Sequence, residues 1–380
     1  MVTRTVTFPL DLTEEQRTVL SETVDLYTKA WNHFVDTAWR NGGMSRKDLH
    51  EETYYYVRSV FGLKSQYTCS SMNRALDTVS SANKLRRRGK KVSKPYSKSV
   101  PIRLDKNTFS FKDDRNAITV TTQGDRIKIP LVWHRHARRY RDWLCISGEI
   151  GFDKWGNPVL RLIFTKEPVV YPRTGVVIGA DRGIKRSVVL SINKFFGKSS
   201  WKEHERKLFS LISRLQAKGT KSAKKHLVKV WRRLKLFREN CDRIVAKEII
   251  ALLKPGDTIV IEDLTNIRDR CGAKGKVHKK HRRKVGRWSF KRLEQMIRYY
   301  AELKGIYVET VEPHYTSQTC SNCGIVSKKN RKSRSMYSCS CGLNLNADLN
   351  AARNIANIWC EANGGAPGPI VNRPFVEASP

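Results

Sequence analysis

Four cysteines near the end of the chain have the spacing of a metal site. Cys320 and Cys323 form a C-x2-C pair, Cys339 and Cys341 form a C-x-C pair, and fifteen residues separate the two pairs. Four thiolates match the tetrahedral coordination of zinc, and a closed set of four ligands leaves no open position for catalysis. The pattern predicts a structural zinc ribbon, and the alternative is two chance pairs of reduced cysteines.

Three carboxylates are candidates for a second, catalytic metal site. Asp181 and Glu262 each end a run of apolar residues typical of a strand, and Asp348 lies in the first turn of a helix that Asn346 can cap. Strand ends and a helix start can bring three carboxylates to one point, where divalent cations relieve their repulsion. Two Mg²⁺ ions about 3.5 to 4 Å apart suit phosphodiester hydrolysis. Taken singly, the three acids also suit a turn residue, a surface acid and a helix cap.

The charge of the chain indicates its partners. It contains 73 Lys and Arg residues against 35 Asp and Glu residues, a net charge of +38. So large an excess indicates a polyanion, and nucleic acid is the first candidate. A membrane surface is the competing candidate, but no window approaches the roughly 18 apolar residues of a spanning helix, so we expect no membrane partner. The N-terminus lacks the apolar core of a signal peptide, so we expect a cytoplasmic protein, associated with the nucleoid in a prokaryote.

The first part of the chain predicts helices followed by an antiparallel sheet. Residues 2–8 alternate like an edge strand, and Thr13 begins a capping box before a helix with one apolar face. Further helices are expected over residues 45–61 and 67–86. From about residue 100 to 170 the apolar residues recur with a period of two, which predicts an antiparallel barrel or sandwich.

After a boundary at Pro172, strands and helices alternate. Two strands precede two long helices broken at Gly219, and a third strand, a helix over 290–303 and a strand over 306–312 follow. That order predicts a mixed sheet with helices packed against it, as in RNase H-like domains. The loop 268–292 is so rich in Lys, Arg and Gly that we expect it to be mobile until nucleic acid binds.

Motifs along the second part of the chain point to a known family. They are GADRGI, IVIEDL, WSF, YTSQTCSNCG, NRKSR, CSCG and NADLNAARNI. In this order they resemble the TnpB family, transposon-encoded RNA-guided DNA nucleases with a split RuvC domain that are related to type V CRISPR effectors. The resemblance implies an α/β RNase H-like (RuvC) nuclease domain with an inserted zinc ribbon, an antiparallel β-barrel wedge domain and a helical recognition lobe.

The resemblance also implies domain boundaries, and the composition of the last residues predicts a disordered tail. The expected segments are 1–10 and 99–172 for the wedge domain, 11–98 for the recognition lobe, 173–313 and 346–360 for the nuclease domain, 314–345 for the ribbon, and 361–380 for a disordered tail.

The resemblance implies a role for each candidate residue. Asp181, Glu262 and Asp348 match three catalytic acids that hold two Mg²⁺ ions, and the four cysteines match the ligands of one Zn²⁺ ion. Arg331, in NRKSR, matches an arginine near the scissile phosphate in related effectors, and Arg334 is a near neighbour. The family further implies a guide RNA derived from the transposon, and double-stranded target DNA opened beside a short motif and cut by one active site. We expect a monomer in complex with RNA.

Three other functions fit parts of the pattern. A nuclease-inactive relative would use its guide only to block promoters, although all three acids are present here. A small CRISPR-associated type V effector shares the same site and differs in its genomic neighbours. A DNA-strand-transferring transposase also uses three acids on an RNase H-like sheet, but usually has no cysteine ribbon before the third acid.

Overall fold

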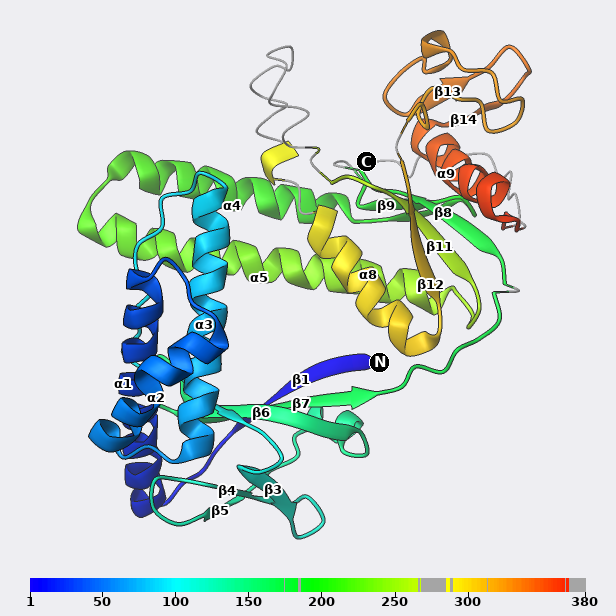
Figure 1. Cartoon of the computed structure of the whole chain (residues 1–380). Helices are drawn as coiled ribbons and strands as arrows, with labels where there is room; N and C mark the ends of the chain where they lie inside the picture. The colour runs from blue at the N-terminus through cyan, green and yellow to red at the C-terminus, as the bar shows by residue number, and fades with distance from the viewer. Residues whose placement is uncertain are drawn as a thin grey trace. The chain divides into compact units, whose positions relative to one another are not determined.

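The computed structural model describes most of the chain as two compact units (Figure 1). The units are Met1–Glu167 and Pro168–Pro380. Within the described ranges, no helix has both the length and the apolar character needed to cross a membrane. The finer division into wedge, lobe, nuclease and ribbon stays a prediction. The described residues are 1–173, 175–183, 186–265, 267, 285–287, 290–312, 314–365 and 367–368.

The first unit contains two separate antiparallel sheets, with strand orders β1-β7-β6-β2 and β3-β4-β5. β1 lies at a sheet edge and alternates between buried and exposed residues, as its sequence predicts. The expected barrel is not closed among the described strands. β2 is three residues long, so it offers too short a hydrogen-bonding edge to complete a ring. The strands are β1 Val2–Pro9, β2 Ile102–Leu104, β3 Phe109–Lys112, β4 Ala117–Val120, β5 Ile127–Pro130, β6 Leu144–Phe152 and β7 Pro158–Lys166.

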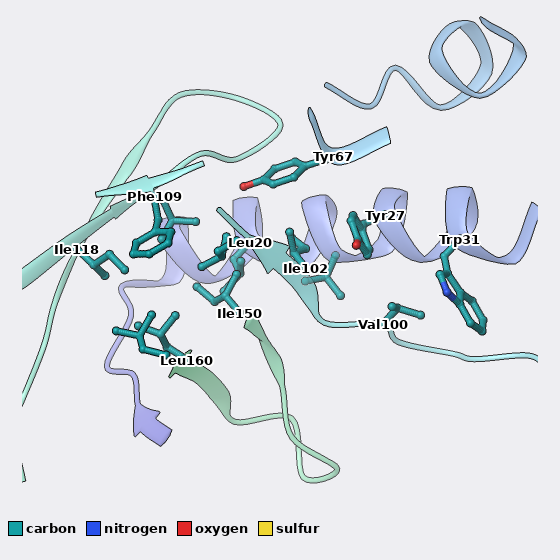
Figure 2. Packing of buried hydrophobic residues seen from close by; sticks show 14 of the residues in the cluster. Leu20, Tyr27, Trp31, Tyr67, Val100, Ile102, Phe109, Ile118, Ile150 and Leu160 are labelled. Carbon is teal, nitrogen blue, oxygen red and sulfur yellow. The ribbon is translucent and has the colours of Figure 1, made fainter. Parts of the chain in front are cut away.

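Three helices share one core with these strands. The helices are α1 Glu14–Arg40, α2 Arg46–Phe61 and α3 Ser65–Arg87, and a short 3-10 turn spans Ala137–Tyr140. The capping box is confirmed, because the hydroxyl of Thr13 accepts a hydrogen bond from the amide of Gln16 at 3.2 Å and the Gln16 side chain bonds back. Figure 2 shows Leu20 of α1 beside Ile102 and Ile150 from the sheet. The helical segment and the strands therefore fold as one unit.

The second unit is built on a five-stranded mixed sheet of the order β10-β9-β8-β11-β12. β8, β11 and β12 are parallel, whereas β9 and β10 run antiparallel. This is the mixed sheet that the sequence predicts. The short strand β10 was not predicted. The strands are β8 Val177–Asp181, β9 Val188–Leu190, β10 Lys194–Phe196, β11 Thr258–Glu262 and β12 Tyr307–Val311.

Helices cover both faces of this sheet. The helices are α4 Ser199–Lys218, α5 Lys221–Ala251, α8 Phe290–Lys304 and α9 Ala347–Asn363. Ile178 and Ile261 pack with residues of α5 and α8, whereas Val177 and Val260 pack with α9. Side chains alternate along a strand, so these neighbours define two opposite faces. Figure 1 shows the resulting three layers within the second unit.

The end of the chain departs from the expected disordered tail. α9 continues to Asn363, and Pro367 forms a parallel bridge with Val177 of β8. The amide of Gly368 donates a hydrogen bond to the Val177 carbonyl at 2.8 Å. Backbone pairing with β8 therefore holds the first part of the tail, which composition alone does not reveal. Residues 369–380 and most of the basic loop, 268–284, lie outside the described residues.

Candidate active site and cysteine cluster

Asp181 and Glu262 occupy matching positions at the ends of neighbouring parallel strands. In the pairing of β11 with β8, Ile261 lies opposite Ala180. Continuing this register by one residue sets Glu262 against Asp181, the last residues of the two strands. Because side chains alternate, Glu262 points to the same face as Val260, the face that α9 covers. The two carboxylates therefore share one edge and one face of the sheet.

Gly179 allows α9 to approach this face closely. A Cβ built at Gly179 would overlap the carbonyl oxygen of Ala352 and lie 2.7 Å from the amide nitrogen of Ala356. Any other residue at this position would push the helix away from β8. The close contact brings the start of α9, with Asp348 in its first turn, toward the strand ends. The sequence contains the glycine but no pattern that reveals this role.

Asp348 is positioned by the predicted cap. The side-chain oxygen of Asn346 accepts hydrogen bonds from the amides of Asp348 at 2.9 Å and Leu349 at 3.3 Å. The cap is thus made by Asn346, and the Asp348 carboxylate is available for other contacts. One such contact is with Arg331, whose Nη2 lies 3.6 Å from Asp348 Oδ1.

The charges of the three acids affect one another. Burial raises the pKa of the Asp181 carboxyl well above its usual range, and the charges of Glu262 and Asp348 raise that pKa further. The guanidinium groups of Arg331 and Arg182 act in the opposite direction. The fold therefore concentrates negative charge at one point, and carboxylate oxygens are the ligands that Mg²⁺ prefers.

Two residues that the sequence did not single out restrain Glu262. The hydroxyl of Thr316 donates a hydrogen bond to Glu262 Oε1 at 2.7 Å, and both groups are buried. Arg182 donates to the Glu262 carbonyl oxygen. The same guanidinium bonds the Phe290 carbonyl at 3.1 Å and forms an ion pair with Glu294 at 3.2 Å, so it joins the strand end to α8. Such contacts between distant segments leave no spacing signal.

The four cysteines form a compact cluster within the ribbon. Their sulfur atoms all lie within 4.8 Å of one another, and the Sγ atoms of Cys320 and Cys341, and of Cys323 and Cys339, are 3.6 Å apart. Thiolates bound to tetrahedral zinc with bonds of about 2.3 Å are separated by roughly 3.8 Å. A backbone hydrogen bond from Leu343 lowers the pKa of the Cys341 thiol to about 6, whereas, despite a backbone hydrogen bond from Ile325, burial and the neighbouring thiols raise the pKa of Cys323. The cluster therefore fits the predicted zinc.

The ribbon is fastened to the helix that carries Asp348. The side chain of Asn354 donates to the Thr316 carbonyl at 2.7 Å, and that of Asn350 donates to the Thr319 carbonyl at 2.7 Å. Both asparagines are buried. This attachment holds Thr316 and Arg331 near the carboxylates. The strands of the ribbon are β13 Met336–Ser338 and β14 Asn344–Asn346, and a 3-10 turn spans Lys328–Asn330.

Sequence comparisons agree with this architecture. Residues 290–355 match the family model "Cas12f1-like, TNB domain". A CRISPR-associated endodeoxyribonuclease Cas12f1 from Sulfoacidibacillus thermotolerans is 42% identical over 32% of this chain and 27% of the relative. A Cas12f1 from Syntrophomonas palmitatica is 28% identical over 84% of this chain and 78% of the relative. A TnpB-like protein from Methanocaldococcus jannaschii is 38% identical over 27% of this chain and 36% of the relative. Two of these alignments thus span only about a third of the relative or less.

Structural comparison extends the likeness to the whole fold. The protein chain in the cryo-EM structure of the Cas12f1-sgRNA-target DNA complex superposes with a TM-score of 0.58. The match covers 90% of this chain and 82% of that chain at 16% sequence identity. The fold shared with that structure includes a mixed α/β layer, and in this chain a cysteine cluster precedes the last helix. The aligned sequence relatives include Cas12f1 effectors and TnpB-like proteins, so the chain is similar to both groups over the parts that align.

Proposed function

We propose that this chain is an RNA-guided DNA endonuclease that hydrolyses phosphodiester bonds of target DNA beside a short adjacent motif. The observation that carries the proposal is the placement of Asp181 and Glu262 at the ends of paired parallel strands, on the face where α9, with Asp348 in its first turn, approaches closely at Gly179. Relatives named as Cas12f1 endodeoxyribonucleases support it. The mutual repulsion of the acids favours catalysis over a purely structural role, because perturbed pKa values cluster at functional sites.

The three carboxylates would hold two Mg²⁺ ions. Carboxylate oxygens are preferred ligands of this hard cation, and the neighbouring negative charges would attract it. When bound, the ions would supply a nucleophile from water and stabilise the charge that develops on the phosphate. The four cysteines would hold one Zn²⁺ ion, which closes the ribbon and takes no part in the chemistry.

Neighbouring side chains would prepare the site for the phosphate. Arg331, 3.6 Å from Asp348, can bind a phosphate oxygen and offset its negative charge. Thr316 holds the Glu262 carboxylate through the buried 2.7 Å hydrogen bond, so that this side chain does not rotate away from Asp181. Arg331 is therefore a candidate catalytic residue, whereas Thr316 is a positioning residue.

Nucleic acid would bind the cationic surface of the protein. The net charge of +38 suits an RNA scaffold, a guide–target heteroduplex and a displaced DNA strand, which together present many phosphates. Base pairing with the guide would then read the target sequence, and the protein would read the shape of the heteroduplex and the adjacent motif. The guide is proposed to come from the transposon that encodes the chain.

A programmed cleavage assay tests the proposal. RNA that copurifies with the protein is sequenced, its variable end is replaced, and plasmids that carry the matching target beside randomised flanks are incubated with the complex and Mg²⁺. We expect cleavage of the matched plasmid next to one enriched flank, and none of a plasmid with a scrambled target. Cleavage that ignores the guide, or matched binding without Mg²⁺-dependent cleavage, would contradict the proposal.

A further inference from the structure

The hairpin of α4 and α5 carries a cavity that is separate from both ligand clusters. Figure 1 shows the two helices side by side as a long antiparallel pair within the second unit. An open cavity of about 760 Å³ lies on this pair. None of its lining residues belongs to the carboxylate site or to the ribbon. They are His204, Lys229, Arg232, Arg233, Leu236 and Phe237.

Three cations line this cavity, namely Lys229, Arg232 and Arg233. Residues 221–238 contain eight Lys and Arg residues and no acid. The nearby acids are engaged elsewhere, since Glu205 pairs with Arg238 and Glu239 lies 3.9 Å from Lys235. In the described part of the chain, no acid pairs with the three cations of the cavity. Three such charges repel one another, so an anion bound between them would lower the energy of the site.

Part of the cavity lining is apolar or aromatic. The rings of His204 and Phe237 lie 4.5 Å apart between centroids and are tilted by 49°. Leu236 is 54% exposed, although it is a large apolar side chain. Phosphate alone needs no such floor, whereas a nucleobase stacks on rings and apolar side chains. A base is available for this contact only when it is unpaired, because a duplex buries both of its faces in the stack.

We propose that this cavity, which we call the hairpin subsite, binds an unpaired nucleotide of a single-stranded nucleic acid. The base packs on Phe237 and Leu236, and the flanking phosphates contact Lys229, Arg232 and Arg233. A second copy of the chain is a poorer occupant, because each copy carries a charge of +38. The subsite does not depend on the cleavage chemistry, so it can be tested independently of the carboxylate site.

Photo-crosslinking of the full-length chain, freed of copurified RNA, tests this assignment. Oligonucleotides that contain one 4-thiouridine or 4-thiothymidine are irradiated with the protein as single strands or as duplexes, and the modified peptides are identified by mass spectrometry. We expect single strands to modify residues of the subsite and duplexes to modify them at least tenfold less. The RNA and DNA arms identify which strand is preferred. The absence of a crosslink there, or equal crosslinking by duplexes, would overturn the proposal.

Variants separate the base contact from the phosphate contacts. Phe237→Leu removes the ring but keeps an apolar side chain, and should weaken single-strand binding about tenfold. The pair Arg232→Gln and Arg233→Gln should reduce the salt dependence of binding, by about 0.7 in log–log slope for each lost contact. The matched control is the pair Arg243→Gln and Lys247→Gln, two exposed cations of α5 that do not line the cavity. The control should leave the crosslink at Phe237 unchanged, and equal loss in the control would contradict the subsite.

Discussion

The cysteine cluster and the carboxylate cluster are assembled in opposite ways. The four cysteines lie within residues 320–341, and among the described residues they are the one set of three or more potential ligands whose atoms all lie within 4.8 Å. The acids at 181, 262 and 348 are separated by 81 and 86 residues and are brought together by strand pairing and by α9. A short segment thus makes the first cluster, and the whole sheet makes the second.

The two clusters have opposite effects on the stability of the folded protein: the cysteine cluster stabilises it, and the carboxylate cluster destabilises it. Zinc binding to thiolates is coupled to the folding of small ribbons. The raised pKa of Asp181, by contrast, means that its ionised form is disfavoured in the folded protein. A carboxylate with a raised folded pKa costs stability once the pH exceeds its unfolded value, and the cost is fully present above the folded pKa. Removing a ligand should therefore have opposite effects on stability at the two sites.

The largest effect on cleavage is expected for Asp181→Asn. It removes one ligand of the proposed Mg²⁺ site, and a loss of several kcal/mol of transition-state stabilisation corresponds to about a thousandfold or more. The same change should raise the melting temperature of the metal-free protein near neutral pH, because it removes a repelled charge. This gain should shrink as the pH falls and Asp181 becomes protonated. Cleavage rates and calorimetry at several pH values provide the measurements.

The affinities for guide RNA and target DNA should stay unchanged in this variant. The matched control is Asp263→Asn, which changes the acid that follows the end of β11. Asp263 is exposed and should tolerate the change without loss of cleavage. If Asp181→Asn lowered binding and stability as much as cleavage, the acid would hold the fold and not the metal.

A smaller loss of cleavage, about a hundredfold, is expected for Cys323→Ser. The loss of one ligand should release zinc and loosen the ribbon that holds Arg331 and Thr316 near the acids. The melting temperature should fall, in contrast to Asp181→Asn. Elemental analysis and thermal unfolding measure both effects, with Cys69→Ser as a control outside the cluster. Full zinc content or normal melting in Cys323→Ser would refute the structural role.

Arg331→Ala should lower cleavage by about ten- to a hundredfold, the range expected for one hydrogen bond to a charged group. Arg334→Ala is the matched control, since Arg334 is near in sequence and contacts Arg331 through its carbonyl oxygen. Single-turnover cleavage rates decide between them. A larger loss in Arg334→Ala would move the phosphate contact to that residue.

The smallest effect, about tenfold, is expected for Thr316→Val. This near-isosteric change removes the hydrogen bond to Glu262 Oε1 and leaves the packing in place. The apparent affinity for Mg²⁺ should weaken while zinc content stays unchanged, which separates the two clusters. Thr316→Ser should restore cleavage by returning the hydroxyl. Failure of serine to restore it would show that the methyl group of Thr316, and not its hydrogen bond, matters.

The sequence by itself determined the features that depend on near neighbours. The cysteine spacing predicted the cluster, Asn346 predicted the cap of α9, and Thr13 with Gln16 predicted the start of α1. The apolar periods of the two long helices predicted α4 and α5, including their break at Gly219. Each of these features lies within one short or continuous segment, where local spacing largely decides which side chains meet.

Tertiary structure decided how distant segments meet. Only strand register and the close approach of α9 at Gly179 bring the predicted acids together, and only packing reveals Thr316 and Arg182 beside Glu262. Packing also left the first unit with two open sheets instead of a closed barrel. The physical reason is that local periodicity describes which face of an element is apolar, whereas the partner of that face is chosen by the shape and charge of the whole core.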